Sequence, residues 1–478
     1  PLRHPMAATL GRRLLSSSLR ADATYDVVVL GGGVIGAWTA VMAAKRGASV
    51  ALAEQFAGPA HERGSSHGDG RIFRLAYEEE HYVDMMLHAL PLWHELQEHA
   101  GEPMFATTGG LNTARRGEGS RGLAKLQALY ERRGIAHELL GGAEARERFP
   151  QFRLSDDTAA LFQKDFGVLF ASPSVEAAWR WAESLGVTTH TGWRAATLRA
   201  DGVDGATAIE SDDGRVLRGK SVVVAPGAWL SPLSSRLFGL DVPSEVSAEV
   251  VSYFAPRDTD TAADAPDHSY ASMPVLLPDV DNGLGALGYY CLPMITTPGI
   301  KVSAHHCGPI VDPDRRPASA GGGNSDGSSS GGGGGSSSSG GEAACGASEE
   351  AAAAERVAAI VASNARLVAD VFPHVEETPF LSQSCLYTTT PDHDYVLDVV
   401  PPPTFASMKR SPSTSSWGRV VLAGGGSGHA FKMGPALGEC AAALALGMPP
   451  PLDVKPFELG RLLGERGRRL QEAPARRK

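Results

Sequence analysis

The sequence has few cysteines, no long apolar run and no excess of basic residues, and each shortage excludes a class of protein. Its five cysteines (Cys291, Cys307, Cys345, Cys385 and Cys440) are odd in number, scattered and without C-x-x-C spacing. This pattern favours a reducing compartment and argues against a disulfide framework or any metal site of the zinc type. No apolar stretch reaches the length of a membrane-spanning helix. A formal net charge of −10 argues against nucleic acid or an anionic membrane as the main partner.

With 478 residues the chain is long enough for two domains, and a pattern near its N-terminal end indicates the first. The short β-branched run Asp26–Leu30 is typical of a buried parallel strand. It leads into Gly31–Gly36, whose sequence GGGVIG fits G-x-G-x-x-G. A helical segment (Ala37–Arg46), a second strand (Ala48–Ala53) and an acidic residue follow. This order predicts a βαβ unit that binds a dinucleotide.

Each part of this pattern has a physical role at a dinucleotide site. Gly31 allows a tight turn, Gly33 lets the backbone approach a pyrophosphate, and Gly36 lets the helix pack closely on the strand. The helix N-terminus at Val34–Ile35 offers N–H groups to phosphates, and Glu54 can accept hydrogen bonds from a ribose. The alternative is a glycine-rich surface turn, but the flanking strands, helix and acid favour the binding site. This stretch does not by itself distinguish FAD from NAD.

Later strands predict that the chain returns to this domain. The strand Ser221–Val224 ends in a turn that contains Gly227, and the strand Val420–Ala423 enters the glycine-rich turn Gly424–His429. A helix at about Pro435–Leu446 follows. We therefore expect the second domain to be interleaved with the first rather than appended to it.

Helical patterns and stretches of biased composition occupy much of the rest. The pattern Glu78–His99 contains Pro91, so we expect a kink or a break there. A further helix is expected at about Ser348–Val371. Residues 1–22 are rich in arginine and serine and contain no acid before Ala21. They match either an organelle transit peptide or a leader without structure, and the sequence leaves both open.

Four stretches, in order along the chain, carry a resemblance to a known family. They are RGSSHGDGRIFR (63–74), GIKVSAHH (299–306), SCLYTTTPD (384–392) and SGHAFK (427–432). With the N-terminal glycine motif they resemble the monomeric sarcosine oxidase and L-pipecolate oxidase family, within the D-amino-acid-oxidase-like flavoproteins. The resemblance extends from Tyr25 to about Pro456 and implies that the dinucleotide is FAD.

The resemblance also implies the fold class. We expect an α/β protein in which a Rossmann-type FAD-binding domain is interleaved with a second, α+β substrate domain built on a mostly antiparallel sheet. The expected division is a leader (1–22), the FAD-binding domain (23–100, 165–235 and 380–456), the substrate domain (101–164 and 236–379), a disordered Gly/Ser insertion (320–341), an inserted loop (401–417) and a basic C-terminal tail (457–478).

Several residues acquire catalytic roles through the resemblance. Cys385 matches the position that bonds through sulfur to the flavin 8-methyl carbon, although alone it would be interpreted as an inert buried thiol. Lys301 matches the lysine beside the ring that speeds reaction with oxygen, because a fixed cation stabilises the charge that develops on superoxide. His305 and Tyr290 resemble side chains that line the substrate pocket. For His305 an ordinary hydrogen-bonded histidine remains the alternative.

Arg74 and Lys432 match the pair that binds the substrate carboxylate, arginine as a planar fork and lysine as a point charge. Their alternative role is in salt bridges to acidic side chains. His67 and Arg71 match basic groups near the flavin ring, and the N-terminus of the Pro435 helix can help to stabilise an anionic ring. The full set of expected cofactor-binding residues is Gly31, Gly33, Val34, Ile35, Gly36, Glu54, Ser65, Ser66, His67, Gly227, Cys385, Gly425, Gly428, His429 and Lys432.

Four positions depart from the family pattern. Gly426 stands where the family usually has phenylalanine, Ala430 where it has glycine, Cys291 where it has glycine and Ala304 where it has tyrosine. We expect all of them near the flavin or the pocket wall, which leaves the size of the pocket and the substrate open.

The resemblance implies an FAD-dependent oxidase of a small secondary-amine amino acid, such as sarcosine, other N-methyl amino acids, L-pipecolate or proline. Hydride would pass from the C–H next to nitrogen to the flavin, and oxygen would become hydrogen peroxide. The alternatives are a dehydrogenase with another electron acceptor, a D-amino-acid or glycine oxidase, and a flavin-binding protein without activity. The resemblance favours a monomer, partnered only by substrate and oxygen. It points to the peroxisome, whereas the N-terminal composition points to a mitochondrion or chloroplast.

Overall fold

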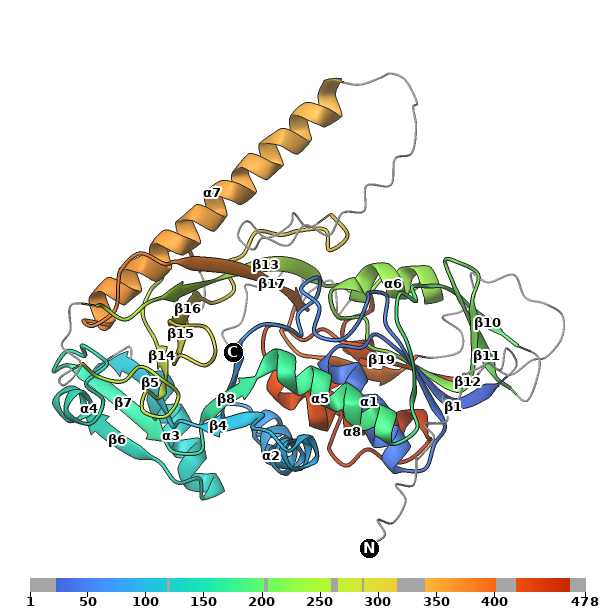
Figure 1. The fold of residues 1–478 in the computed structure, drawn as a ribbon, viewed down its shortest axis with the longest axis horizontal. Coiled ribbons are helices and arrows are strands. Elements are labelled where there is room, and N and C mark those ends of the chain that lie inside the picture. Colours follow the sequence, from blue (N-terminus) through green and yellow to red (C-terminus); the bar gives the residue numbers. More distant parts are fainter. Residues whose placement is uncertain are drawn as a thin grey trace, which may run out of the picture.

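The computed structural model describes residues 23–117, 121–201, 205–258, 265–285, 288–315, 340–400 and 418–464. Two eight-stranded sheets and one three-stranded sheet form its framework. Four helices gather on one large sheet, and a fifth, α7 (Gly340–Val371), extends along the other (Figure 1). The four are α1 (Val34–Lys45), α2 (Glu80–Ala100), α5 (Ala171–Ser184) and α8 (Gly434–Ala445). The expected leader, the inserted loop 401–417 and the Gly/Ser insertion up to residue 339 lie outside the described residues.

The first large sheet contains the parallel strands that the sequence predicted. β1 (Thr24–Leu30) lies between β2 (Val50–Ala53) and β12 (Val216–Val224) and pairs in parallel with both. β12 in turn pairs in parallel with β19 (Arg419–Gly424), so strands from distant parts of the sequence lie next to one another. The other strands of this sheet are β9 (Thr188–His190), β10 (Ala195–Ala200), β11 (Thr207–Ser211) and β18 (Val396–Val399).

Two apolar helices make the closest contact on this sheet. α1 (Val34–Lys45) is buried over most of its length, because its sequence is almost entirely alanine and other apolar residues. It packs against α8 (Gly434–Ala445), where a Cβ on Gly438 would come within 2.5 Å of the Trp38 Cβ. The helices therefore approach one another at a distance that only glycine permits. Further helices are α2 (Glu80–Ala100), α5 (Ala171–Ser184) and α6 (Leu230–Phe238).

Of the two outcomes expected at Pro91, a kink or a break, the break is wrong. α2 continues through Pro91 to Ala100. Proline removes the N–H that would bond to the carbonyl of Leu87, but Pro91 and Leu87 both lie on the exposed side of the helix. That carbonyl can bond to water, while Trp93 and Leu96 remain fully buried on the opposite side. The packing of this buried side keeps the helix intact.

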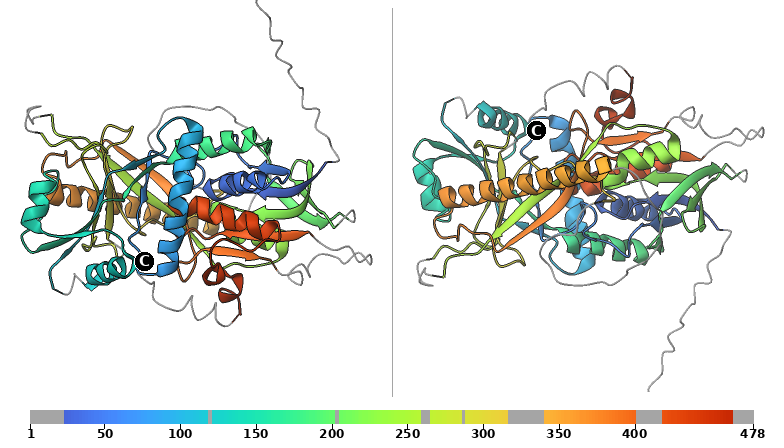
Figure 2. Two further views of the ribbon diagram at one scale, coloured as in Figure 1. Left: turned by 90° about the horizontal axis from the view of Figure 1, so that it is seen from below. Right: turned by 90° about the horizontal axis from the view of Figure 1, so that it is seen from above.

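The second large sheet is mostly antiparallel, with a single parallel pair, β14–β5, among the described strands. β13 (Glu245–Phe254) pairs along β17 (Leu381–Thr389), so β17 belongs to this sheet although its residues were expected in the FAD-binding segment 380–456. α7 (Gly340–Val371) begins eight residues before the expected Ser348 and lies lengthwise over the sheet (Figure 2). The other strands are β5 (Gly110–Arg115), β6 (Glu138–Gly141), β7 (Thr158–Gln163), β14 (Val275–Pro278), β15 (Tyr289–Leu292) and β16 (Ile300–Ala304).

A small third sheet and several further helices complete the described part of the chain. The sheet consists of β3 (Gly70–Phe73), β8 (Gly167–Phe170) and β4 (Phe105–Thr107). The further helices are α3 (Arg121–Arg133), α4 (Gly142–Arg148), η2 (Gly227–Trp229), η4 (Phe431–Met433), η5 (Lys455–Phe457) and η6 (Leu459–Arg461). In the described part of the chain, no helix combines the length and apolar character needed to cross a bilayer.

The first part of the expected C-terminal tail belongs to the folded core. Phe457, Leu459 and Leu462 are each 1% exposed. The guanidinium of Arg461 donates to Asp392 at 2.9 Å, with 7% and 11% of the two side chains exposed. Burial raises the pKa of Asp392, but the hydrogen bonds and the charge of Arg461, together with hydrogen bonds from Asp394 and Thr390, outweigh this and lower the pKa below its usual value. Residues 465–478 lie outside the description.

This buried ion pair gives a stability prediction. Arg461→Met should lower the free energy of unfolding by about 3–5 kcal/mol, because the Asp392 carboxylate would stay buried without its counter-ion. Lys125→Met removes the exposed Lys125–Glu78 pair, which spans 3.2 Å, and serves as the matched control. The control should change the free energy by less than about 1 kcal/mol. Urea unfolding measures both, and equal losses would show that Arg461 does not hold a buried charge.

Candidate functional site

A cavity of about 380 Å³ lies where the carboxyl ends of β1 and β19 meet the second large sheet. This is the edge at which open α/β sheets bind their ligands. The walls come from the turn after β1, from β3 and its neighbours, from β15 to β17 and from the turn after β19. A smaller cavity of about 100 Å³ continues from it, and Gly33, Ser65, Ser66, Ala225 and Gly227 line both. The two cavities form one elongated site.

The smaller cavity is built around the glycine motif. Gly31 adopts a φ of +99°, and a Cβ there would lie 2.2 Å from the Ala225 carbonyl oxygen. A Cβ on Gly36 would lie 1.8 Å from the Gly31 carbonyl oxygen, so helix α1 can begin this close to β1 only with glycine at position 36. Glu54 is buried, and its Oε2 accepts a hydrogen bond from the Gly32 N–H at 2.7 Å. The motif therefore places a carboxylate and a helix N-terminus at one cavity.

A serine also lies at the N-terminus of α1. The Val34 N–H, which the sequence assigned to a phosphate, donates to Ser66 Oγ at 3.0 Å. Ser65 Oγ donates to the Leu386 carbonyl at 2.6 Å and thereby ties this loop to β17. A cradle of glycine backbone, a helix N-terminus and a buried carboxylate fits the adenosine diphosphate half of a dinucleotide. The larger cavity then remains for the ring system at its other end.

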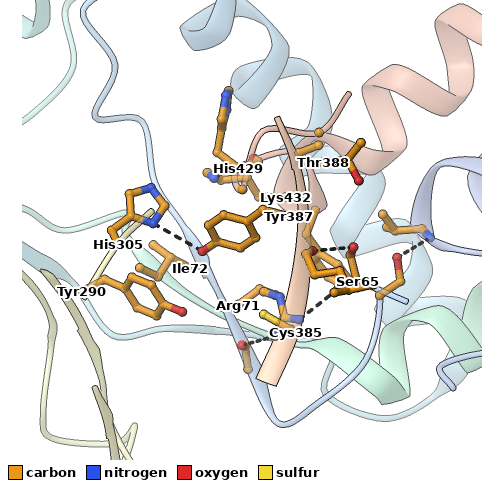
Figure 3. A pocket seen from close by; sticks show the side chains of 18 of the residues that line it. Ser65, Arg71, Ile72, Tyr290, His305, Cys385, Tyr387, Thr388, His429 and Lys432 are labelled. Carbon is orange, nitrogen blue, oxygen red and sulfur yellow. Dashed lines mark hydrogen bonds between the residues drawn. The ribbon is translucent and has the colours of Figure 1, made fainter. Parts of the chain in front are cut away.

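Two cations share one carbonyl in the larger cavity. Lys301, on β16, is 5% exposed, and its Nζ donates to the Gly70 carbonyl at 3.0 Å. Arg71, on β3, donates to the same carbonyl at 3.0 Å and to the Ser65 carbonyl at 3.0 Å. Burial, followed by the charge of Arg71, lowers the pKa of Lys301 to about 7. Lys301 can therefore gain and lose a proton near neutral pH. Figure 3 shows Arg71 beside Cys385, whose thiol also lines the cavity.

A second pair of cations, Arg74 and Lys432, lines the same cavity. Lys432 lies on η4, and its Nζ donates to the His429 carbonyl at 2.8 Å. Burial and the charge of Arg74 lower the pKa of Lys432 well below its usual value. Among the residues the structure describes, neither cation forms an ion pair with an acidic side chain, which was the alternative role for both. They are available to bind an anion.

A hydrogen-bonded pair, Tyr387 on β17 and His305 in the turn after β16, also lines this cavity. The Tyr387 hydroxyl lies 3.3 Å from His305 Nδ1, and the Tyr290 ring lies 5.9 Å from the His305 ring (Figure 3). Burial lowers the pKa of His305 well below its usual value and raises the pKa of Tyr387. His305 is therefore a neutral ring at this site. The sequence analysis missed Tyr387, yet strand alternation could have found it, because it follows Cys385 by two residues on the same face of β17.

The other expected residues are distributed as follows. Gly425, Gly428 and His429 line the larger cavity. Gly36 and His67 line neither cavity: Gly36 acts through the α1–β1 contact, and His67 is buried at 9% exposure. His429 lies against the Tyr395 hydroxyl, which is 2.6 Å from its Nδ1.

The expectation that all four departures from the family pattern border the pocket is wrong for two of them. Gly426 and Ala430 line the larger cavity. Cys291 and Ala304 are fully buried in the apolar cluster that includes residues of α7. Alternation explains this, because Tyr290 on β15 points to the cavity and its neighbour Cys291 must point to the opposite face of the sheet.

Comparison with known proteins is consistent with this geometry. The family model of FAD-dependent oxidoreductases matches residues 26–444. The chain is 28% identical over 438 residues to peroxisomal sarcosine oxidase of Mus musculus, covering 91% of this chain and 96% of that one. It is 28% identical over 441 residues to monomeric sarcosine oxidase of Bacillus sp. (strain B-0618), and the match covers 91% of this chain and 96% of that one. The structure of glycine oxidase from Geobacillus kaustophilus superposes with a TM-score of 0.66 at 19% sequence identity. The superposition covers 93% of this chain and 100% of that chain, so the two proteins share the fold.

The contact at Gly36 leads to a test of the dinucleotide site. Gly36→Ala should abolish most FAD binding, because its Cβ would force α1 away from β1 and move the helix N-terminus. Gly58→Ala is the control, since a Cβ there meets nothing within 4 Å. The ratio of flavin to protein absorbance measures the bound fraction. A flavin content in Gly36→Ala equal to that of the control would contradict the assignment.

Proposed function

The chain belongs to the FAD-dependent oxidoreductase family, and we propose that it oxidises a small secondary-amine amino acid with oxygen as the acceptor and hydrogen peroxide as the second product. Candidate substrates are sarcosine, other N-methyl amino acids, L-pipecolate and proline. The observation that carries this proposal is the pair of the half-buried Arg74 and the buried Lys432, two cations without an acidic partner among the described residues, in the same cavity as Lys301. The names of the sarcosine oxidases to which the chain is similar support this substrate class.

The residues of the two cavities fit FAD as the cofactor. The glycine motif and Glu54 would hold the adenosine diphosphate half, and the larger cavity would hold the isoalloxazine ring within reach of Cys385. When bound, this ring supplies a two-electron acceptor for the C–H next to the substrate nitrogen. The thiol of Cys385 lines the cavity at 8% exposure, which supports a covalent tether to the ring.

The cations determine how the substrate lies and in which protonation state it reacts. A carboxylate bound to Arg74 and Lys432 gains charge-assisted hydrogen bonds, and the planar guanidinium fixes its orientation. Four cationic side chains (Arg71, Arg74, Lys301 and Lys432) line the cavity. Together with desolvation they lower the pKa of the substrate amine. The amine therefore binds as the neutral form, whose electron pair favours oxidation, and no dedicated base is needed.

The presence of Lys301 favours oxygen over another molecule as the electron acceptor. A fixed, buried cation stabilises the negative charge that develops when oxygen is reduced. The nearest alternative, a dehydrogenase that passes electrons to a quinone or a protein, has no need of this charge. We also propose a monomeric enzyme, located in the peroxisome by similarity to its relatives or in a mitochondrion or chloroplast by its N-terminal composition.

The direct experiment is a substrate screen with the purified holoenzyme. Hydrogen peroxide release is measured with sarcosine, other N-methyl amino acids, L-pipecolate, L-proline, glycine and D-amino acids. Turnover with peroxide release on secondary amines, and little on the primary amines, is the expected result. Reduction of an artificial electron acceptor without peroxide would establish the dehydrogenase instead.

Lys301 should control the oxygen-dependent half of the reaction. Lys301→Met removes the charge while keeping much of the volume, and kcat/KM for oxygen should fall by about 10²–10³-fold. In the wild type this constant should decline as the pH rises through about 7, because Lys301 loses its proton there. The variant should show no such decline. Stopped-flow mixing with oxygen measures both, and a variant that keeps the wild-type rate would place oxygen activation elsewhere.

Arg74 should control the other half of the reaction, in which the amino acid reduces the flavin. Arg74→Lys keeps the charge but loses the two-point contact with a carboxylate, so KM for the amino acid should rise by roughly tenfold or more. The rate of reaction with oxygen should stay near that of the wild type, in contrast to Lys301→Met. Anaerobic stopped-flow reduction over a range of substrate concentrations is the measurement. An unchanged KM would mean that the carboxylate binds at another position.

Cys385 should carry the cofactor covalently. Acid-precipitated wild-type protein should stay yellow, and a tryptic peptide containing Cys385 should carry the flavin mass. Cys385→Ser should release its flavin into the acid supernatant. Cys291→Ser is the matched control, because that thiol is also buried but faces away from the cavity, and it should keep the flavin bound. Free FAD in the supernatant of the wild type would refute the tether.

A further inference from the structure

Tyr77 lies behind the cavity and contacts both of its unpaired cations. Its side chain is 3% exposed and does not line the cavity. The Arg74 guanidinium carbon lies 4.8 Å from the centre of the Tyr77 ring, and the Lys432 Nζ lies 5.5 Å from it. Both distances are within the range of a cation–π contact. Arg74 and Tyr77 follow β3, whereas Lys432 lies on η4, so one ring connects two distant parts of the chain.

The ring is itself held firmly in place. Tyr77 packs against Tyr82 at 5.1 Å and His429 at 5.8 Å between ring centres. Its hydroxyl lies 3.4 Å from His429 Nδ1, and the carbonyl of His429 accepts the hydrogen bond from Lys432 Nζ at 2.8 Å. His429 therefore touches both the ring and one of the cations above it. The Tyr395 hydroxyl, 2.6 Å from the same Nδ1, fixes the imidazole.

Such a ring offsets the electrostatic repulsion between the two cations. Like charges that lie close together repel one another, and burial, followed by the charge of Arg74, lowers the pKa of Lys432. An acidic side chain would relieve this repulsion but would also compete with the substrate carboxylate. The electron-rich face of an aromatic ring attracts both cations and carries no charge. It leaves their remaining N–H groups to an incoming anion.

We propose that Tyr77 is a positioning residue for the carboxylate end of the substrate: its ring holds Arg74 and Lys432 in the arrangement that a single carboxylate bridges. This inference rests on the proposed function in one respect, namely that these two cations bind the substrate carboxylate. Tyr77 itself touches neither substrate nor cofactor and acts through the cations.

The test uses a pair of unreactive ligands and the purified holoenzyme. Methoxyacetate has the shape and carboxylate of sarcosine with an ether oxygen in place of the amine, and 2-methoxyacetamide replaces the carboxylate by a neutral amide. Isothermal calorimetry gives the Kd of each. Tyr77→Leu should weaken methoxyacetate binding by about tenfold to thirtyfold, the factor that a desolvated cation–π contact contributes. Binding of the amide should stay unchanged, because it does not depend on the paired charges.

Two further variants separate the ring's contact with the cations from a general loss of packing. Tyr77→Phe keeps the ring and should bind methoxyacetate within about threefold of the wild type, since phenylalanine still offers a π face. Phe73→Leu removes a fully buried ring that packs edge-to-face against Phe105 and lies next to Arg74 in the chain, but for which no contact with a cation is found among the described residues. It should also bind both ligands as the wild type does. Tyr77→Met fills the site with an adaptable side chain and takes the place of Tyr77→Leu should that protein not fold.

The outcomes distinguish this inference from the proposed function. A Tyr77→Leu or Tyr77→Met protein that binds methoxyacetate like the wild type overturns the positioning role. So does an equal loss of methoxyacetate and amide binding, because that result reports a damaged pocket. A wild-type enzyme that binds the two ligands equally well shows that Arg74 and Lys432 do not bind a carboxylate, and it overturns the proposed function together with the inference. A selective loss for methoxyacetate, rescued by phenylalanine, supports both.

Discussion

The gathering of four partly or fully buried cations around one cavity, without acidic partners in the part of the chain that the structure describes, is the constraint on which the rest of this structure depends. Arg71, Arg74, Lys301 and Lys432 face one cavity, and none of them forms an ion pair with an acidic side chain in the described part of the chain. A buried cation is costly unless hydrogen bonds satisfy it. Here backbone carbonyls and an aromatic ring stabilise the cations. The carbonyls of Gly70, Ser65 and His429 accept hydrogen bonds from three of them. The Tyr77 ring contacts Arg74 and Lys432. The remaining attraction is directed at an anionic ligand.

This arrangement is possible only because several distant segments converge. Ser65–Arg74, the β15–β16 hairpin, the C-terminal half of β17 and the turn after β19 each contribute one wall of the cavity. The long pairing of β13 with β17 carries the chain from the second sheet to the edge of the first. Hydrogen bonds from loops, such as the one that Ser65 Oγ donates to the Leu386 carbonyl on β17, then join the segment after the first sheet to the second sheet. The cavity is a product of the interleaving, since no single segment contains more than one side of it.

The structure departs from the sequence-based expectations on the second sheet and at Pro91. Cys291 and Ala304 lie in stretches near the expected pocket, but they point to the opposite face of the second sheet. The alternation of a strand predicts that neighbours face opposite ways, so the assignment of Tyr290 to the pocket already implied that Cys291 faces away from it. Pro91 favoured a kink or a break, and the packing of α2 prevents the break. At Pro91 an interaction with residues far away in the sequence decided the outcome.

The sequence by itself determined the dinucleotide motif, and its resemblance to a known family implied the α/β class with an interleaved second domain and the main polar residues of the cavity. The motif follows from local requirements: only glycine fits at Gly31 and Gly36, where a Cβ would meet backbone oxygens at 2.2 and 1.8 Å, and a strand followed by this turn and an apolar helix is recognisable within one short window. Only the tertiary structure decided that β17 joins the second sheet, that Lys301 and Arg71 share the Gly70 carbonyl and that Tyr77 lies against two cations. Such contacts join segments hundreds of residues apart, and their geometry depends on how whole sheets pack, which no local pattern encodes.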